Sequence, residues 1–345
     1  MGITKFLESF TFDDVLIKPS RSSIEPREAK LRAVLASGLD LEVPFFSAAM
    51  DRVTEEKMAI EIGKNGGMGV IHRNCTVLRQ KEMVRKVKAQ GVKVAAACGP
   101  FDLARAMVLQ KAGIDLLVID CAHGHNTKVI KSARNIKKKI GRVPIMVGNI
   151  ATAEAAHDLA GVADIVKVGV GPGSICTTRI VSGVGVPQLT AILDVAAVAH
   201  RLGMKVVADG GMRTSGDIAK ALAAGADAVM LGNMFAGTEE APGKIVLRKG
   251  KRYKEYRGMG SKAVLDEKKS SDRYMVEGRK AVPEGIEGWV PYKGSVRAII
   301  EELVSGIQVS MGYVGSKTIS EFQKKAKFVR ITSASMQESK PHSIF

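Results

Sequence analysis

The chain has 345 residues, of which 46% are hydrophobic and 5% aromatic, and its formal net charge is +17. This length and composition suit one large aliphatic core and argue against two small domains or a disordered chain. No apolar run reaches the roughly 18 to 20 residues that span a bilayer, and the first ten residues match neither an export signal nor a lipid anchor, so we expect a soluble, cytoplasmic protein.

Short apolar runs rich in Val, Ile and Ala recur along the chain, and each ends in glycine or a polar residue or is followed directly by one. The runs cover residues 43–50, 68–72, 92–98, 116–120, 144–149, 165–170, 206–209 and 228–232. Between them, apolar residues recur at three- and four-residue spacing, as in 102–112, 152–160 and 215–224, which is typical of helices. Eight apolar strands alternating with helices predict an α/β fold, a closed (β/α)8 TIM barrel.

Two connections are longer than simple turns: the stretch from 170 to 189 and the stretch from 237 to 293. Long segments in compact domains are usually functional loops or lids, and the second stretch is the better candidate for a mobile flap. We therefore predict a single catalytic domain over 1–345, with a flap or insert at about 240–294 and a tail at about 330–345.

Two glycine-rich loops follow the seventh and eighth predicted strands, ADGGMR (208–213) and LGNMFAG (231–237). Barrels of this type often bind phosphate at these two loops, and glycines let backbone N–H groups approach an anion. Plain turn glycines are the alternative. Asp209 leads the first loop, where its carboxylate would accept hydrogen bonds from ribose hydroxyls or cap a helix.

The four cysteines lie far apart in the sequence, with no CxxC pair, which predicts reduced thiols and makes a zinc site unexpected. Cys75, Cys98 and Cys121 lie in or beside apolar strands and are expected to be inert core thiols. Cys176 differs, because it lies in the glycine-rich loop 169–188, where backbone N–H dipoles would favour the thiolate. By itself this leaves a nucleophile and a structural thiol equally open.

The positive charge is dispersed, and its densest stretches are 137–139, 249–257 and 324–327. These stretches contain few aromatic residues apart from Tyr253 and Tyr256, so base stacking has little support. We expect solvated surface charge, with an attraction for phosphorylated small molecules as the alternative, and we do not expect a nucleic-acid partner.

Several motifs together resemble the inosine monophosphate (IMP) dehydrogenase family over essentially the whole chain. They are SAAMDRVTE (47–55), DCAHGH (120–125), GPGSICTTR (171–179), ADGG (208–211), AGTEEAPG (236–243), YRGMGS (256–261), DRY (272–274) and PEGIEG (283–288). The pair of CBS modules common in that family is missing, because the chain runs straight on between 85 and 94, where they would be inserted.

The resemblance implies that Cys176 attacks C2 of IMP, that a hydride passes to NAD, and that water then hydrolyses a thioimidate to xanthosine monophosphate. It also assigns roles to further residues. Those implied for binding the substrate IMP are Ser174, Asp209, Gly210, Gly211, Gly232, Asn233, Tyr256, Gly258, Met259, Gly260 and Glu284; those for the cofactor NAD are Asp120, Asn149, Gly169 and Gly171. The activity would belong to guanine nucleotide biosynthesis.

For the hydrolysis step the resemblance implies that Arg273 and Tyr274 in the flap activate water. Guanidinium hardly deprotonates in proteins, so a proton path through Thr178 and Glu284 stays open beside it. The resemblance further implies a homotetramer with a potassium ion between subunits. The ion would be bound by backbone carbonyls of Gly171, Gly173 and Cys176, and by those of Glu338, Ser339 and Lys340 from a neighbouring subunit.

The chain departs from the family pattern at three positions: Asn233 replaces a usual serine, Lys340 a usual histidine and Met275 a common phenylalanine. Three alternatives also remain. A GMP reductase, using NADPH, shares the barrel and the cysteine loop, but is expected to lack the Arg-Tyr pair and the EEAPG and RGMGS forms. A non-catalytic nucleotide- or nucleic-acid-binding barrel and an FMN-dependent oxidoreductase are the others.

Overall fold

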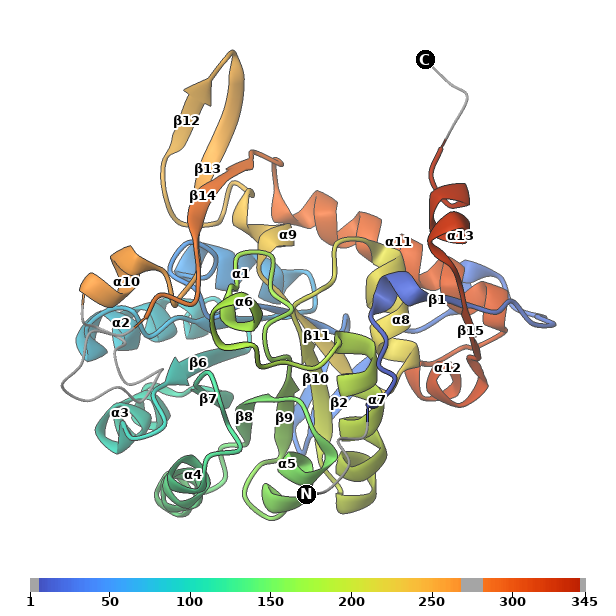
Figure 1. The fold of residues 1–345 in the computed structure, drawn as a ribbon. Coiled ribbons are helices and arrows are strands. Elements are labelled where there is room, and N and C mark those ends of the chain that lie inside the picture. Colours follow the sequence, from blue (N-terminus) through green and yellow to red (C-terminus); the bar gives the residue numbers. More distant parts are fainter. Residues whose placement is uncertain (1–5, 268–281, 342–345) are drawn as a thin grey trace.

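A closed barrel of eight parallel strands forms the centre of the molecule (Figure 1). The computed structural model describes residues 6–267 and 282–341. The strands are β4 (Phe45–Ser47), β5 (Met68–Ile71), β6 (Val94–Cys98), β7 (Leu116–Asp120), β8 (Ile145–Ile150), β9 (Ile165–Val168), β10 (Lys205–Asp209) and β11 (Ala228–Leu231). Each of the eight predicted apolar runs overlaps one of them, and β8 and β10 each extend one residue beyond their run. The predicted (β/α)8 barrel is therefore confirmed.

Helices follow the strands and cover the outside of the barrel (Figure 1). They are α1 (Glu56–Lys64), α2 (Val77–Lys88), α3 (Leu103–Ala112), α4 (Thr127–Ile140), α5 (Ala153–Asp158), α7 (Gln188–Ala199), α8 (Ser215–Ala223) and α11 (Val296–Val314). Shorter ones are α6 (Thr178–Ser182), α9 (Asn233–Ala236), α10 (Lys262–Asp266), α12 (Ile319–Lys325) and α13 (Ser333–Glu338). Side chains such as Thr76, Asp102 and Thr214 accept a backbone N–H of the following helix, which fixes where it begins. In the two described ranges, no helix is both long and apolar enough to cross a membrane.

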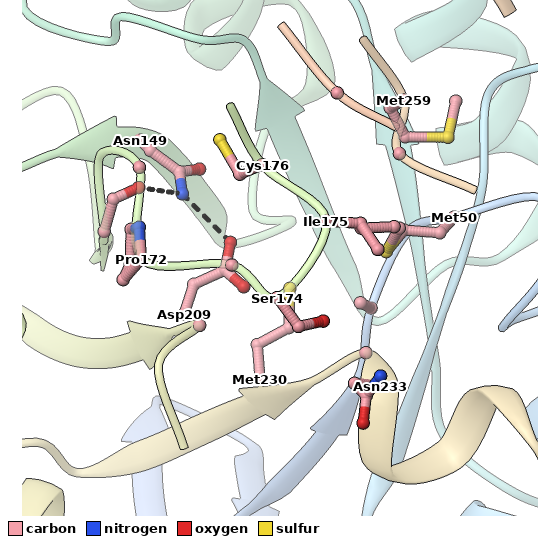
Figure 2. A pocket seen from close by; sticks show the side chains of 18 of the residues that line it. Met50, Asn149, Pro172, Ser174, Ile175, Cys176, Asp209, Met230, Asn233 and Met259 are labelled. Carbon is pink, nitrogen blue, oxygen red and sulfur yellow. Dashed lines mark hydrogen bonds between the residues drawn. The ribbon is translucent and has the colours of Figure 1, made fainter. Parts of the chain in front are cut away.

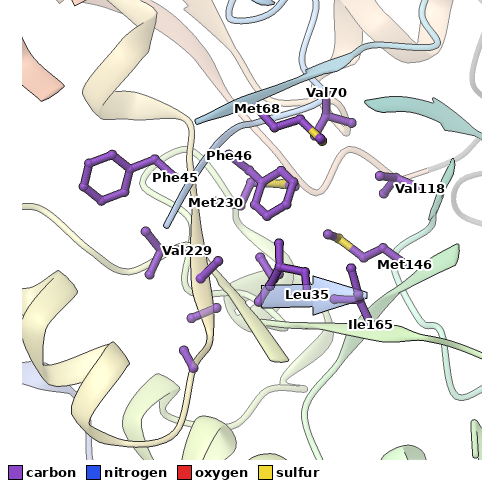
Figure 3. Close-up of a cluster of buried hydrophobic side chains, with 14 of the residues drawn as sticks. Leu35, Phe45, Phe46, Met68, Val70, Val118, Met146, Ile165, Val229 and Met230 are labelled. Atoms are coloured by element: carbon purple, nitrogen blue, oxygen red, sulfur yellow. The ribbon is translucent and has the colours of Figure 1, made fainter. Parts of the chain in front are cut away.

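Aliphatic side chains fill the barrel, as the low aromatic content implies. Val118, Met146 and Ile165 come from three neighbouring strands and are fully buried together (Figure 3). Leu35 lies among them, although it belongs to β2 (Ala33–Ala36), which pairs with β3 (Leu39–Leu41) outside the barrel. This N-terminal hairpin therefore contributes directly to the core. A further small sheet joins the two ends of the chain, with β1 (Val15–Ile17) antiparallel to β15 (Phe328–Arg330).

The segment predicted as one long flap is in large part regular structure. Strands β12 (Ile245–Arg248), β13 (Lys251–Arg257) and β14 (Glu287–Pro291) form an antiparallel sheet that projects from the barrel (Figure 1). Its turn is tight because Lys249 and Gly250 both adopt positive φ angles, 50° and 75°, which suits a two-residue hairpin. The flap residues Arg273, Tyr274 and Met275 lie outside the described residues.

The expectation that the basic stretch 249–257 is solvated was wrong for two of its members. Lys254 is 2% exposed, and its ammonium donates to the carbonyls of Thr238 and Glu239 at 2.9 and 3.3 Å and to that of Ala241. Arg257 is also buried and pairs with Asp51. These cations hold the base of the sheet to the barrel, because a buried charge needs several compensating partners.

Gly148 on β8 makes room for a large neighbour inside the barrel. A Cβ atom at this position would lie 2.6 Å from Cβ and 2.8 Å from the carbonyl oxygen of Lys167, so rotating a side chain would not relieve the contact. We expect Gly148→Ala to lower the free energy of unfolding by about 1 to 3 kcal/mol, measured by urea titration. Gly288→Ala is the matched control, because a Cβ there meets nothing within 4 Å. Equal stability of the two variants would contradict the prediction.

Candidate active site

A cavity of about 260 Å3 opens at the carboxyl ends of the barrel strands (Figure 2), where active sites of this fold lie. The predicted site residues that line it are Asp120, Asn149, Gly169, Gly171, Gly173, Ser174, Cys176, Thr178, Asp209, Gly210, Gly211, Gly232, Asn233, Tyr256, Gly258, Met259, Gly260 and Glu284. Glu338, Ser339 and Lys340 do not line it; they lie at the exposed end of α13. Arg273 and Tyr274 fall outside the described residues.

Main-chain hydrogen bonds hold the loop of Cys176 against a segment that is more than a hundred residues away in sequence. Thr177 N donates to the carbonyl of Glu284 at 2.9 Å, and Ile286 N donates to that of Ile175 at 3.0 Å. Cys176 and Gly285 thereby form a short antiparallel bridge. The bridge brings the Cys176 thiol and the Glu284 carboxylate to the same wall of the cavity.

A chain of side-chain hydrogen bonds connects that thiol to the carboxylate. The Sγ atom of Cys176 donates to Oγ1 of Thr178 at 3.1 Å, and Oγ1 of Thr178 donates to Oε2 of Glu284 at 2.7 Å. The hydroxyl can accept a proton on one side while it donates one on the other. The arrangement therefore offers a proton path between the cysteine and an acid.

The other three thiols are placed differently. Cys98 and Cys121 are fully buried, as predicted for core cysteines. Cys75 is half-buried, and burial raises the pKa of its thiol, which disfavours the reactive thiolate. Cys176 is thus the cysteine whose surroundings suit reaction with a ligand in the cavity.

The glycines after β10 and β11 form the end of the cavity that suits an anion. Gly210 and Gly211 adopt φ angles of +89° and +85°, a backbone shape that side chains rarely tolerate. At Gly232, a Cβ atom would lie 2.9 Å from the hydroxyl of Tyr256, so only glycine leaves that hydroxyl accessible. Burial raises the pKa of Tyr256, which therefore remains a neutral donor.

A cluster of four buried or partly buried polar side chains, Asp120, Asn149, Lys167 and Asp209, lies at the inner end of the cavity. The Lys167 ammonium is 3.2 Å from Oδ1 of Asp120 and 2.6 Å from Oδ2 of Asp209, and it also donates to Oδ1 of Asn149. The amide of Asn149 donates to Oδ2 of Asp209 at 3.0 Å and to the Gly169 carbonyl at 2.6 Å, as the dashed lines in Figure 2 mark.

Asp120, Asn149 and Asp209 are among the site residues that the sequence predicts, whereas Lys167 is not. The sequence predicts an apolar strand over 165–170, although this run contains one charged residue. A lysine inside a strand that is buried on both faces is itself a signal, because it must find compensating partners within the barrel. Lys167 is thus the signal in the sequence that points to this cluster.

The residues implied for potassium are only partly brought together. Gly171, Gly173 and Cys176 share one loop beside the cavity, whereas 338–340 lie apart from it on the same chain (Figure 1). In the described part of the chain, no backbone donor reaches the carbonyl oxygens of Gly171 or Cys176, while that of Gly173 accepts the N–H of Cys176 at 3.1 Å. Oxygens with free lone pairs are the donor type that suits a hard monovalent cation.

Comparison with known proteins shows the family to which the chain is related. A family model described as "IMP dehydrogenase / GMP reductase domain" matches residues 9–342. The chain is 42% identical to inosine-5'-monophosphate dehydrogenase of Borreliella burgdorferi, covering 99% of this chain and 98% of the relative. It is 41% identical to the enzyme of that name from Cryptosporidium parvum, covering 100% and 97%.

Another relative is aligned over more positions than this chain has residues. Inosine-5'-monophosphate dehydrogenase of Methanocaldococcus jannaschii is 38% identical over 485 aligned positions, covering 100% of this chain and 97% of the relative. Those 485 positions exceed the 345 residues of this chain by 140. The region predicted to lack the CBS modules is a simple connection, since α2 ends at Lys88 and β6 begins at Val94.

Proposed function

The chain belongs to the family of IMP dehydrogenases and GMP reductases, and from that premise we propose how its cavity performs the reaction. Its function is the NAD-dependent oxidation of IMP to xanthosine monophosphate, since the relatives compared above are IMP dehydrogenases and nearly their whole length is covered. The alternatives, GMP reductase among them, are not favoured. The observation that carries the mechanism is the hydrogen-bonded series of Cys176, Thr178 and Glu284 in the cavity wall.

Cys176 is the nucleophile in this proposal. Its proton leaves through Thr178 toward Glu284, and the thiolate adds to C2 of the purine ring. Bound NAD would supply the acceptor for the hydride from C2, and a thioimidate would then remain on Cys176. Water then adds to C2, the carbon–sulfur bond breaks and the thiolate leaves, so that one difficult displacement becomes two easier steps.

The remaining lining residues divide IMP and NAD between two ends of the cavity. Ser174 with Gly210, Gly211, Gly232 and Asn233 binds the phosphate of IMP, because free backbone N–H groups and hydroxyls suit an anion. Asp209 accepts hydrogen bonds from the IMP ribose. Around the purine and the phosphate lie Tyr256, Gly258, Met259, Gly260 and Glu284.

The NAD end is formed by Asp120, Asn149, Gly169 and Gly171. The donor set fits a nicotinamide riboside, because Asp120 supplies a buried carboxylate for ribose hydroxyls and Asn149 an amide fixed by its own hydrogen bonds. In this arrangement the chain's residues bind and orient the dinucleotide beside the carbon that Cys176 attacks. Orientation of this kind accounts for much of the rate in two-substrate reactions.

The activation of water has two proposed routes, the Arg273–Tyr274 pair and the Thr178–Glu284 path. We expect Glu284→Gln to slow steady-state turnover by about 100-fold, because the amide cannot accept the proton that Thr178 passes on. The first equivalent of NADH should also form more slowly, since in this proposal the same carboxylate takes the proton that leaves Cys176. Stopped-flow absorbance separates the two phases.

The matched control is Glu287→Gln, an exposed glutamate on β14 outside the cavity. It should leave both phases unchanged. An unchanged steady-state rate in Glu284→Gln would instead assign water activation to the Arg273–Tyr274 pair.

A potassium ion and a homotetramer form part of the proposal. The carbonyls of Gly171, Gly173 and Cys176 would supply one half of the ion's ligands, and residues 338–340 of a neighbouring subunit the other half. The exposure of 338–340 on this chain supports a contact with another copy. We also propose a cytoplasmic location, since the four cysteines are unbridged.

The test of the function is the appearance of NADH from IMP and NAD in potassium chloride. NADPH loss with GMP, measured in parallel, would indicate the reductase, and a yellow purified protein would indicate bound FMN. Activity that falls in lithium chloride and returns with potassium supports the ion site, and a mass four times that of the monomer by light scattering supports the tetramer. No turnover with either nucleotide would leave only a binding function.

A further inference from the structure

We propose that Lys167 is a positioning residue that couples the IMP end of the cavity to the NAD end. It would do so by holding Asp209 and Asp120 in place with a single ammonium group. This inference rests on the proposed function, because it takes these two carboxylates as the acids that bind the two riboses.

Lys167 is placed where its charge can act only within the cavity. Its side chain is 2% exposed, and its ammonium contacts side chains from the three strands β7, β8 and β10. Asp120 belongs to the proposed NAD end and Asp209 to the proposed IMP end. The lysine therefore links these two carboxylates directly, beside the hydrogen bond from Asn149 to Asp209.

The barrel is shaped to admit this lysine. In the register of the sheet Lys167 lies between Gly148 on β8 and Val207 on β10, and Gly148 in turn lies beside Asp120 on β7. The missing side chain at 148 leaves the space that the lysine stem occupies, since an added Cβ would collide with it. The ammonium is thereby directed toward Asp120 instead of into the aliphatic core.

Electrostatics makes the lysine necessary. Oδ1 of Asp120 and Oδ2 of Asp209 lie 3.2 and 2.6 Å from the same nitrogen, Nζ of Lys167. The two oxygens are therefore no more than 5.8 Å apart. Two carboxylates this close in a poorly hydrated site repel each other strongly unless a cation lies between them. Without the ammonium, at least one of them would have to move.

The hydrogen-bond pattern of Asp209 shows what the lysine achieves for the ligand. Oδ2 of Asp209 accepts from both Lys167 and Asn149, whereas no donor among the described residues reaches its Oδ1. One oxygen is thus fixed by the protein while the other is left to accept from a ribose hydroxyl. We infer that Lys167 sets the strength with which the enzyme recognises the ribose of IMP.

The test compares the dissociation constant of IMP with those of 2′-deoxy-IMP and 3′-deoxy-IMP, by titration calorimetry without NAD. In the wild type we expect the analogue that lacks the recognised hydroxyl to bind about 10- to 100-fold more weakly than IMP, as for loss of a hydrogen bond to a charged group. In Lys167→Met this ratio should fall to about one, as in Asp209→Asn. Lys167→Arg should restore most of the wild-type ratio. The KM for NAD should rise about 10-fold in Lys167→Met but not in Asp209→Asn or Lys167→Arg.

The control is Lys254→Met, because Lys254 is an equally buried lysine whose carbonyl partners lie outside the cavity. Lys254→Met should lower stability and leave the analogue ratio unchanged. If the role of Lys167 were purely structural, Lys167→Met would behave in the same way. If Lys167→Met does not fold, Lys167→Gln gives the same test, since it keeps a donor and removes the charge.

The inference would be overturned if a folded Lys167→Met or Lys167→Gln variant kept the wild-type ratio of dissociation constants. It would also be overturned if the wild type bound IMP and both deoxy analogues equally well. Failure of the wild type to oxidise IMP would be a separate result and would count against the proposed function. The two failures are therefore distinguishable.

Discussion

Replacing Cys176 with alanine should abolish the formation of NADH from IMP while IMP still binds with an affinity within a few-fold of the wild type. Without the sulfur no bond to C2 can form, so hydride transfer loses its covalent route. Removal of a nucleophile from a preorganised site costs about five to six orders of magnitude in kcat. Phosphate and ribose contacts lie elsewhere in the cavity and should persist. Absorbance of NADH and titration calorimetry with IMP measure the two quantities.

Cys75→Ala is the matched control, because Cys75 is likewise half-buried but does not line the cavity. Its activity should stay within a few-fold of the wild type. Mass spectrometry adds a direct readout, since acid quenching during turnover should trap the nucleotide on Cys176 in the wild type only. Substantial NADH formation by Cys176→Ala would remove the cysteine from the mechanism.

Asp209→Ala should lower kcat/KM for IMP by about 100- to 10,000-fold, which corresponds to the loss of one or two hydrogen bonds to a charged acceptor. The variant also removes one of the two carboxylates that neutralise Lys167. Because Asp120 and Asn149 remain, we expect the free energy of unfolding to fall by only about 1 to 3 kcal/mol. Initial rates at varied IMP and a urea titration measure the two effects.

Asp194→Ala removes an exposed carboxylate on α7 and is the control for this change. It should alter neither kcat/KM nor stability by more than a small factor. An Asp209→Ala enzyme with unchanged kcat/KM for IMP would show that the ribose is recognised elsewhere. If Asp209→Ala lost much stability but kept its kinetics, Asp209 would serve only to neutralise Lys167.

Most of the site could be located from the sequence because the fold puts every strand's carboxyl end at the same rim. Cys176 follows β9, and the glycines at 210, 211 and 232 follow β10 and β11, so their convergence required only the order of the strands. The resemblance to known enzymes then supplied roles for these residues. Glu284 could be placed only through that resemblance, because no barrel strand leads to it.

Local pattern therefore determined the barrel, its eight strands and the loops that carry the chemistry, because apolar periodicity and glycine positions act over a few neighbouring residues. Tertiary structure decided which distant groups meet. It buried Lys254 and Arg257 in a stretch that looked solvated, set Glu284 against Cys176, and placed Lys167 between two carboxylates. A buried charge is stable only where partners from other strands surround it, and that condition depends on the closed barrel as a whole.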